Sequence, residues 1–371
     1  MLKFSIRLIA VISFALAAFG AMVISYASKS QGQGPYHYLI MQSVFLLGGL
    51  IGAFILYHVD YHFYKKPVVL WMLVIGMVLS LLLVLVPGVG KAVKGAHRWI
   101  ALGPVNVQPV EFVKLMMVLF LAGYLELQEG RIRRFKQGVL LPGIVIGAVL
   151  ACLIAQPDFG GSMVVCALAG ATLLMGGIGW KRCMLFGALG VLAIGVFLAC
   201  NPNRVARLKN EQNGENYQAE QSETAFRNGR VLGAGLGVGL QREKYLPECH
   251  TDFIFAIIGE DLGLVATASI TGAFLLILLG GTVIACHARD KQGMLLAFGA
   301  TLLICAQGTA NMAVVTHILP TKGLALPFLS YGGSCLLSSF AAVGVLLGVG
   351  RVTIEAESAS EQAVQKIVSF D

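Results

Sequence analysis

The stretch Glu248-Cys249-His250-Thr251-Asp252-Phe253-Ile254-Phe255-Ala256-Ile257-Ile258-Gly259-Glu260-Asp261 opens a long apolar segment that continues to residue 286. The whole chain has only 19 acidic residues among 371, so their clustering here is not background. Carboxylates beside hydrocarbon are costly and usually mark a functional site. The stretch therefore indicates both a membrane-spanning helix and a site at its mouth.

Composition supports the membrane class. The chain is 57% hydrophobic and 12% charged, with a mean hydropathy of +0.79. A soluble domain is about 25% charged. The net charge of +8 is weak evidence for nucleic acid, which we do not expect as a partner. It fits basic loops on the cytoplasmic side of a membrane and an anionic substrate.

Apolar segments long enough to cross a bilayer predict an all-α, polytopic membrane protein with about ten transmembrane helices and a large extracytoplasmic loop. We read the first segment as a retained helix rather than a cleaved signal peptide. The eighth is long enough to require tilt, a kink near Gly259 or Gly263, or a part above the bilayer. The predicted spans are 6–27, 39–57, 68–87, 108–126, 139–155, 160–178, 182–200, 253–286, 292–316 and 330–350.

Basic residues in the short loops predict that both termini are cytoplasmic. The outer loop 88–107 is an exception because it also carries basic residues. We expect one transmembrane domain over 1–352, with the long loop 201–252 outside. A short, polar cytoplasmic tail over 353–371 is expected to lack stable structure apart from a terminal turn. The inner loops carry Lys65, Lys66, Arg131, Arg133, Arg134, Lys136, Lys181, Arg182, Arg289 and Lys291.

Two patterns look like cofactor sites. Alternating glycines over 233–239 match a dinucleotide finger only superficially, because that motif needs a βαβ unit. A tight backbone path is the better interpretation. His58 and His62, with Asp60, could ligate a metal, but an interfacial polar turn is the simpler explanation. The eight cysteines are scattered without a CxxC pair, so no zinc-type ligand set is present.

Four polar clusters interrupt the apolar pattern, and all lie on the predicted outer side. In the first, Glu111 and Lys114 are three residues apart and can pair on one helix face. Their common location predicts one outward-facing site. The clusters are 98–114, 156–161, 248–261 and 320–334.

Each cluster also has a structural interpretation. Asp158 and Asp252 could simply cap the helices that follow them. Glu111 and Lys114 could form a structural pair, and the glycines and prolines of 320–334 could form a rigid turn. These alternatives stay open at the level of sequence.

The motifs together resemble the SEDS family (shape, elongation, division and sporulation), and they follow the family order along most of the chain. The segments Pro320-Thr321-Lys322-Gly323 and His250-Thr251-Asp252 resemble its division branch, FtsW, more than its elongation branch, RodA. The resemblance is carried by Arg98-Trp99, Gln108-Pro109-Val110-Glu111-Phe112-Val113-Lys114, Gln156-Pro157-Asp158-Phe159-Gly160, Pro247-Glu248-Cys249-His250-Thr251-Asp252-Phe253-Ile254-Phe255-Ala256 and Leu326-Pro327-Phe328-Leu329-Ser330-Tyr331-Gly332-Gly333-Ser334.

The resemblance implies a ten-span peptidoglycan glycosyltransferase of the bacterial cytoplasmic (inner) membrane, with its site facing outward at the division septum. It would polymerise lipid II together with a class B penicillin-binding protein and other divisome membrane proteins. The resemblance also implies that Asp252 is the essential acid and that Glu111 and Lys114 lie in the central cavity. Val110 departs from the usual Ser of the motif, and 224–230 departs from the usual small-residue loop.

The chemistry predicts roles for these residues. Asp252 is the candidate general base, because a positioned carboxylate can accept a hydroxyl proton. The leaving diphosphate needs positive charge, for which Lys114, Arg98 and Lys322 are candidates in falling order, with Glu111 orienting Lys114. A divalent cation, Mg²⁺ or Mn²⁺, is a plausible addition.

Two other classes of function remain. A lipid II flippase or other transporter would also need buried charge, but its site should lie near the bilayer midplane with access to both sides. A scaffold that only recruits a transpeptidase would not need the acids of the eighth segment. The outer location of the polar clusters favours the enzyme.

Overall fold

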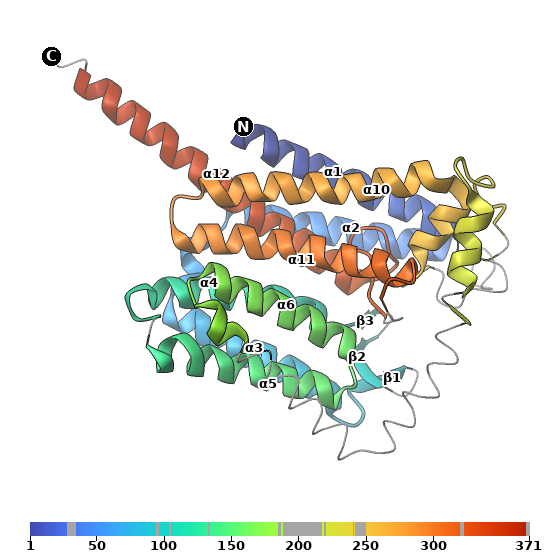
Figure 1. Cartoon of the computed structure of the whole chain (residues 1–371), viewed down its shortest axis with the longest axis horizontal. Coiled ribbons are helices and arrows are strands. Elements are labelled where there is room, and N and C mark those ends of the chain that lie inside the picture. The colour runs from blue at the N-terminus through green and yellow to red at the C-terminus, as the bar shows by residue number, and fades with distance from the viewer. Residues whose placement is uncertain are drawn as a thin grey trace.

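The computed structural model of the chain describes residues 1–27, 35–93, 96–103, 105–132, 134–184, 187, 217–218, 220–239, 241, 250–319 and 323–368. Within them, the fold is a bundle of long helices with one small antiparallel sheet at one end (Figure 1). The predicted all-α, polytopic class is confirmed. By length and composition, seven of the described helices can cross a membrane.

Nine of the ten predicted spans correspond to described helices, and the remaining one, 182–200, lies almost wholly outside the described residues. The fifth span, expected to be short, is lengthened by a π-helical turn, η4 (Lys136–Leu140). The helices are α1 (Leu2–Ala27), α2 (Pro35–His58), α3 (Pro67–Leu85), α4 (Pro109–Leu127), α5 (Leu141–Ala155), α6 (Phe159–Met175), α10 (Ile254–His287), α11 (Lys291–Val315) and α12 (Gly333–Val368).

Helix α4 is the buried centre of the bundle. It packs against α3, α6, α11 and α12, and almost every side chain from Pro109 to Leu125 is buried. Helices α11 and α12 are also mostly buried, whereas α2 and α3 expose most of their apolar side chains, as lipid-facing helices do. Charged residues on α4 are therefore enclosed by protein rather than by lipid.

The two ends of the bundle differ. One end holds the start of α1, the end of α12 and two short 3-10 helices, η2 (Tyr61–Lys65) and η3 (Glu129–Arg131). The other holds the sheet and the start of α10 (Figure 1). This arrangement agrees with termini on one side and polar clusters on the other, and we call these the inner and outer ends.

The outer loop before α4 forms a three-stranded sheet that the sequence analysis did not predict. Its strands are β1 (Gly90–Val93), β2 (Ala96–Leu102) and β3 (Val105–Val107), in the order β1-β2-β3. Ile100 pairs with both Gly90 and Val107. Because β3 ends two residues before α4, the sheet fixes Arg98 beside the outer end of the bundle.

The expectation of an unstructured tail is wrong for the described residues, since α12 continues through Arg351 to Val368. Residues 351–362 combine good helix formers with an ion pair of 2.9 Å between Arg351 and Glu355, four residues apart. A polar composition at a chain end was mistaken for disorder. The domain boundary at 352 is not marked by any break in this helix.

Candidate active site at the outer end of the bundle

The buried pair Glu111–Lys114 predicted from its spacing is present. Lys114 Nζ lies 2.7 Å from Glu111 Oε1 and donates a second hydrogen bond, of 2.6 Å, to Gln307 Oε1 on α11. Lys114 is 0% exposed. The amide nitrogen of Gln307 completes the network with a bond of 3.4 Å to Glu111 Oε2. Buried charges are tolerated when they are paired and hydrogen-bonded in this way.

The start of α4 is held by the start of α12. The hydroxyl of Ser338 donates to the carbonyl of Glu111 at 2.6 Å. The backbone N–H of Gln108, which precedes the helix, donates to Ser334 Oγ at 2.8 Å. Pro109 at the first helical position needs no hydrogen bond of its own. Two serines in the first turns of α12, Ser334 and Ser338, therefore fix the position of the start of α4, which carries Glu111 and Lys114.

Two amides on α11 join this network to the acidic stretch. Gln307 donates to the carbonyl of Ala325 at 3.0 Å. One turn later, Asn311 donates to the carbonyls of Leu324 at 2.5 Å and of Asp252 at 2.8 Å. One face of α11 thus holds the 323–326 segment and the residue before α10 in fixed relation.

Asp252 is partly exposed at the outer end of the bundle. A Cβ atom at Gly323 would lie 2.8 Å from its Oδ2, so the carboxylate rests against the glycine. The neighbouring backbone is fixed as well. Thr251 accepts a 2.5 Å bond from Ser330 Oγ, and His250 accepts one of 2.9 Å from the N–H of Tyr331.

Helix capping does not explain Asp252. The cap position of α10 falls on Phe253, and no side chain makes a capping hydrogen bond there. Asp158, in contrast, is a cap, because its carboxylate accepts the N–H of Gly161 at 3.1 Å at the start of α6. The structural interpretation therefore holds for Asp158.

Arg98 connects the sheet to the turn before α6. Its guanidinium donates to the carbonyl of Pro157, donates to that of Gln156 at 3.4 Å, and lies 3.9 Å from the Asp158 carboxylate. Arg98 therefore holds the turn of the second polar cluster in place. Its side chain is 30% exposed.

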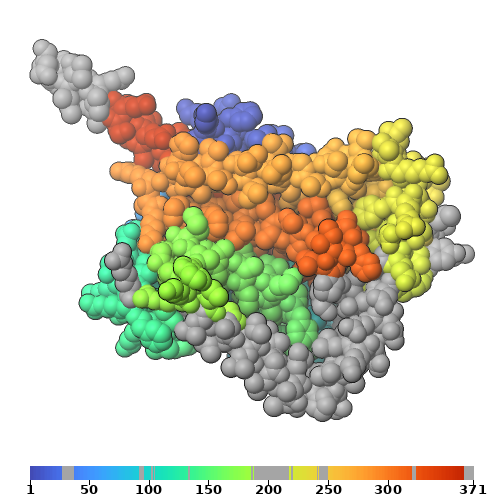
Figure 2. All heavy atoms as spheres, in the orientation of Figure 1, coloured from blue at the N-terminus to red at the C-terminus, as the bar shows by residue number. Residues whose placement is uncertain are grey.

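Two other acids of the opening stretch, Glu260 and Asp261, bind the alternating glycines of 233–239, which we call the glycine loop, and the residues that flank them. Asp261 accepts the N–H groups of Gly237 at 3.0 Å and Gly239 at 3.1 Å. Glu260 accepts the side-chain amide of Asn228 at 3.1 Å and the N–H of Gln241 at 3.2 Å. Both acids are buried, and their carboxylates are used to hold the loop. In Figure 2, residues 220–239 (yellow) cover the end of the bundle where α10 begins.

The kink predicted for the eighth span occurs at Gly263, whose φ of 72° and ψ of −168° are not helical. The break frees two N–H groups of α10. Leu264 and Val265 donate them to the carbonyls of Arg230 and Val231, at 3.0 and 3.3 Å. The residues directly before the alternating glycines therefore accept the hydrogen bonds that the helix loses at its break.

The sequence comparison matches this arrangement to a known family. The sequence profile described as cell cycle protein, which groups FtsW, RodA and SpoVE, covers residues 6–354. The chain belongs to this family. It is the SEDS family that the motifs resemble.

Two relatives named probable peptidoglycan glycosyltransferase FtsW illustrate the similarity. The protein of Geobacter sp. strain M18 is 37% identical over 344 residues, covering 90% of this chain and 93% of the relative. That of Trichlorobacter lovleyi is 38% identical over 348 residues, covering 90% of each. Both names agree with the predicted division branch.

Solved structures of the family have the same fold. RodA of Thermus thermophilus superposes with a TM-score of 0.69 at 27% identity, covering 92% of this chain and 95% of its own. A chain from a peptidoglycan synthase complex, described as coordinating polymerization and crosslinking, gives 0.74 at 27% identity, covering 93% and 97%.

Not every predicted residue converges on one point. Asp252 is joined to the Glu111–Lys114 pair through α11, whereas Arg98 is tied to the turn at 156–158. Lys322, with Glu248 and Cys249, lies outside the described residues. Gln307 and Asn311 were missed. Their signal was two amides, four residues apart, inside an apolar span.

The two departures from the SEDS motifs now have a structural context. Val110 is buried against α6, where a Cβ atom at Gly161 would lie 2.9 Å from a Val110 methyl group. Residues 220–229 are helical, and Gly229 packs directly on the backbone of Gly259. Arg227 is exposed and pairs with Glu223 at 2.7 Å.

The histidine pattern at the inner end is a polar turn. The Nδ1 and Nε2 atoms of His62 contact Asp60 at 2.6 Å and Asp290 at 2.7 Å, so neither ring nitrogen is left for a metal. Burial acts to raise the pKa of Asp60, but hydrogen bonds from His62 outweigh it and leave the pKa below its ordinary value. His58 instead contacts the Phe54 carbonyl. Among the described residues, no three His, Cys, Asp or Glu side chains form a metal-binding group.

Proposed function

We propose that this chain is a division-type peptidoglycan glycosyltransferase, which polymerises lipid II at the outer face of the cytoplasmic membrane. Family membership over residues 6–354 and the names of its relatives support the activity. The observation that carries the site is the position of Asp252. The residue is partly exposed at the outer end, its carboxylate rests against Gly323, and its backbone carbonyl accepts a hydrogen bond from Asn311.

In this proposal, Asp252 accepts the proton of the attacking sugar hydroxyl as general base. The hydroxyl oxygen then forms a new bond to the anomeric carbon of the second glycan, and the bond from that carbon to the lipid diphosphate breaks. Rigid support of the base contributes to the rate, because misplacement by about 1 Å can cost roughly a hundredfold. Asn311, Ser330 and Gly323 supply that support here.

The leaving diphosphate needs positive charge, for which there are three candidates. Lys322 directly precedes Gly323, which rests against Asp252. Arg98 is partly exposed at the neighbouring turn. Lys114 is sealed and would reach the substrate only after exchanging a bond to Glu111 or Gln307. We therefore propose Lys322 and Arg98 as the outer contacts, and Lys114, oriented by Glu111, as a contact that requires the network to open.

A divalent cation would fit this site if the protein and the diphosphate of the substrate both bound it. Mg²⁺ is usually bound by one or two carboxylates together with substrate phosphates. Asp252, which is partly exposed at the outer end, could join the diphosphate oxygens of lipid II in this way, whereas Glu260 and Asp261 hold the glycine loop. Mg²⁺ or Mn²⁺ would there neutralise the charge of the leaving group.

The proposed partners follow from the relatives. A class B penicillin-binding protein would crosslink the strands that this chain makes; the peptidoglycan synthase complex that contains a chain of the same fold is described as coordinating polymerization and crosslinking. Other divisome membrane proteins would bring the pair to the septum of the inner membrane.

The activity is tested by incubating the purified chain with lipid II, alone and with a class B penicillin-binding protein, and separating the products by size. Glycan polymer is expected with the partner. Absence of polymer under both conditions would overturn the enzyme assignment. If the chain instead moved lipid II across vesicle membranes without polymerising it, the protein would be a lipid II transporter and not a glycosyltransferase.

The orientation is tested with an impermeant thiol reagent on intact cells, in a background lacking the native cysteines. Lys91→Cys, in strand β1, should be labelled. Arg131→Cys, in the inner turn η3, should be labelled only after lysis. Both positions are exposed, so the reverse pattern would invert the topology.

A further inference from the structure

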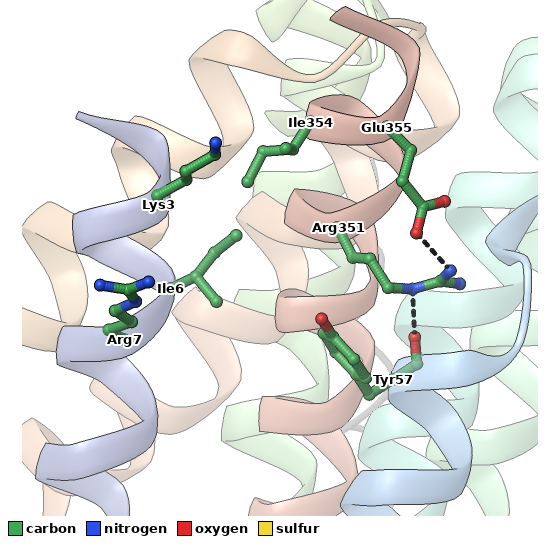
Figure 3. A pocket seen from close by; sticks show the side chains of 7 residues that line it. All are labelled: Lys3, Ile6, Arg7, Tyr57, Arg351, Ile354 and Glu355. Carbon is green, nitrogen blue, oxygen red and sulfur yellow. Dashed lines mark hydrogen bonds and ion pairs between the residues drawn. The ribbon is translucent and has the colours of Figure 1, made fainter. Parts of the chain in front are cut away.

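A cavity of about 350 Å³ lies at the inner end of the bundle, far from the candidate active site. It is formed where α1 begins, α2 ends and α12 leaves the bundle. Its volume is near the lower limit of ordinary small-molecule sites, roughly 300–1,000 Å³. The lining residues are Lys3, Ile6, Arg7, Tyr57, Arg351, Ile354 and Glu355 (Figure 3).

Of the four charged side chains that line the cavity, two pair with each other and two form no ion pair within the described part of the chain. Arg351 is fully engaged: it donates to the carbonyls of Tyr57 at 3.0 Å and His58 at 3.2 Å, and it pairs with Glu355 at 2.9 Å. Glu355 is thereby neutralised. Lys3 and Arg7, one helical turn apart on α1, are both exposed, and neither forms an ion pair with any residue in the part of the chain that is described. Two positive charges therefore remain for a ligand.

The helix itself adds to this field. Helix α1 starts at Leu2, so its unpaired N–H groups and the positive end of its dipole lie beside Lys3. The carbonyl end of α2, which would oppose an anion, is occupied by Arg351. The local electrostatics therefore favour a negatively charged group.

The other half of the cavity is apolar. Ile6 and Ile354 extend into it from α1 and α12 (Figure 3). Next to Lys3, Phe4 is 69% exposed on the surface of α1, where a membrane-spanning helix meets lipid. A ligand that fits must combine an anionic group with a hydrocarbon part and arrive from the membrane, which a soluble acidic peptide does not do.

We propose that this cavity binds the phosphate headgroup of an anionic phospholipid, in the leaflet on the side of the two termini. Lys3 and Arg7 contact the phosphate, and Ile6 and Ile354 border the glycerol and the first acyl carbons. The site is independent of polymerisation and does not rest on the proposed function.

The test measures retained lipid by native mass spectrometry of the full chain in detergent. Phosphatidylglycerol and phosphatidylcholine are added at equal concentration. The wild type should retain phosphatidylglycerol selectively, and Lys3→Gln/Arg7→Gln should bind it roughly 10- to 30-fold more weakly. Arg131→Gln/Arg134→Gln is the matched control, because it removes two exposed charges from the same end, outside the cavity, and should bind as the wild type does.

A second variant separates shape from charge. Ile6→Trp fills the cavity while all charges stay, and it should also lose the selective retention. Equal retention by the wild type, the Lys3/Arg7 double variant and Ile6→Trp would overturn the proposal. Displacement of the lipid by inorganic phosphate at the same concentration, or by a soluble acidic peptide, would replace the lipid with that ligand and overturn it as well.

Discussion

The side-chain amide of Asn311 donates to the backbone carbonyl of Asp252 at 2.8 Å, so a buried residue of α11 positions the proposed base without touching its carboxylate. Backbone support and proton transfer can therefore be separated by mutation. A change at the carboxylate leaves this bond to the backbone in place.

Asp252→Asn should keep a folded protein and lower polymerisation of lipid II by about 10²–10⁴-fold, because an amide cannot accept the proton. Asp252→Glu should recover little, because the longer side chain displaces the carboxylate. The measurement is initial rate of glycan formation beside the melting temperature. Near-normal activity of the Asn variant would place the base elsewhere.

Asp261→Asn and Glu248→Gln are the comparison variants for Asp252, and both should lose much less activity. Asp261 accepts two N–H groups of the glycine loop, so its variant should mainly lower the melting temperature. If Asp261→Asn abolished activity without destabilising the protein, the base would be Asp261.

Gly323→Ala should slow polymerisation by roughly 10- to 100-fold with little change in melting temperature. Its Cβ atom would lie 2.8 Å from Asp252 Oδ2 and push the carboxylate aside. Gly323 is itself exposed, so the substitution strains no core packing. A variant as active as the wild type would show that the Asp252 side chain can move without cost.

Lys114→Met and Glu111→Gln should each destabilise the protein, by about 3–5 kcal/mol, since each leaves a buried charge without its partner. The double variant should recover most of that stability. If Lys114 also contacts the diphosphate, the double variant will be stable but inactive. Normal activity of the double variant would show that the pair has only a structural role.

Gly263→Ala should destabilise the protein by about 1–3 kcal/mol or more, because φ of 72° with this ψ is a region that essentially only glycine occupies. A Cβ atom there would also lie 2.4 Å from the Gly233 nitrogen. Gly272→Ala is the matched control, in the same helix with nothing within 4 Å, and should be neutral or slightly stabilising. Equal melting temperatures of the Gly263→Ala and Gly272→Ala variants would show that the fold does not depend on a glycine at the kink.

The spans, the outer site and the kink could be predicted because each depends on one local property: the length of an apolar run, the location of charges, or a glycine in a helix. The sheet over 90–107 could not, since its strands are short and Ile100 pairs with residues on both sides. The Gln307–Asn311 connection could not either. An amide in an apolar span indicates a polar contact but not its partner. That Gln307 contacts Lys114 and Asn311 contacts Asp252 depends on how the helices pack.

The break at Gly263 also divides the length of α10. Its 34 residues would measure about 51 Å as one straight helix, well beyond a hydrocarbon thickness of about 30 Å. The part after Gly263, residues 264–287, measures about 36 Å and is sufficient to cross the membrane alone. A crossing by residues 264–287 alone would leave residues 254–262, with Glu260 and Asp261, outside the hydrocarbon. It would put Asp252 beyond them, in the polar interface, which is where the proposed function needs the base to meet the diphosphate of a lipid-linked sugar.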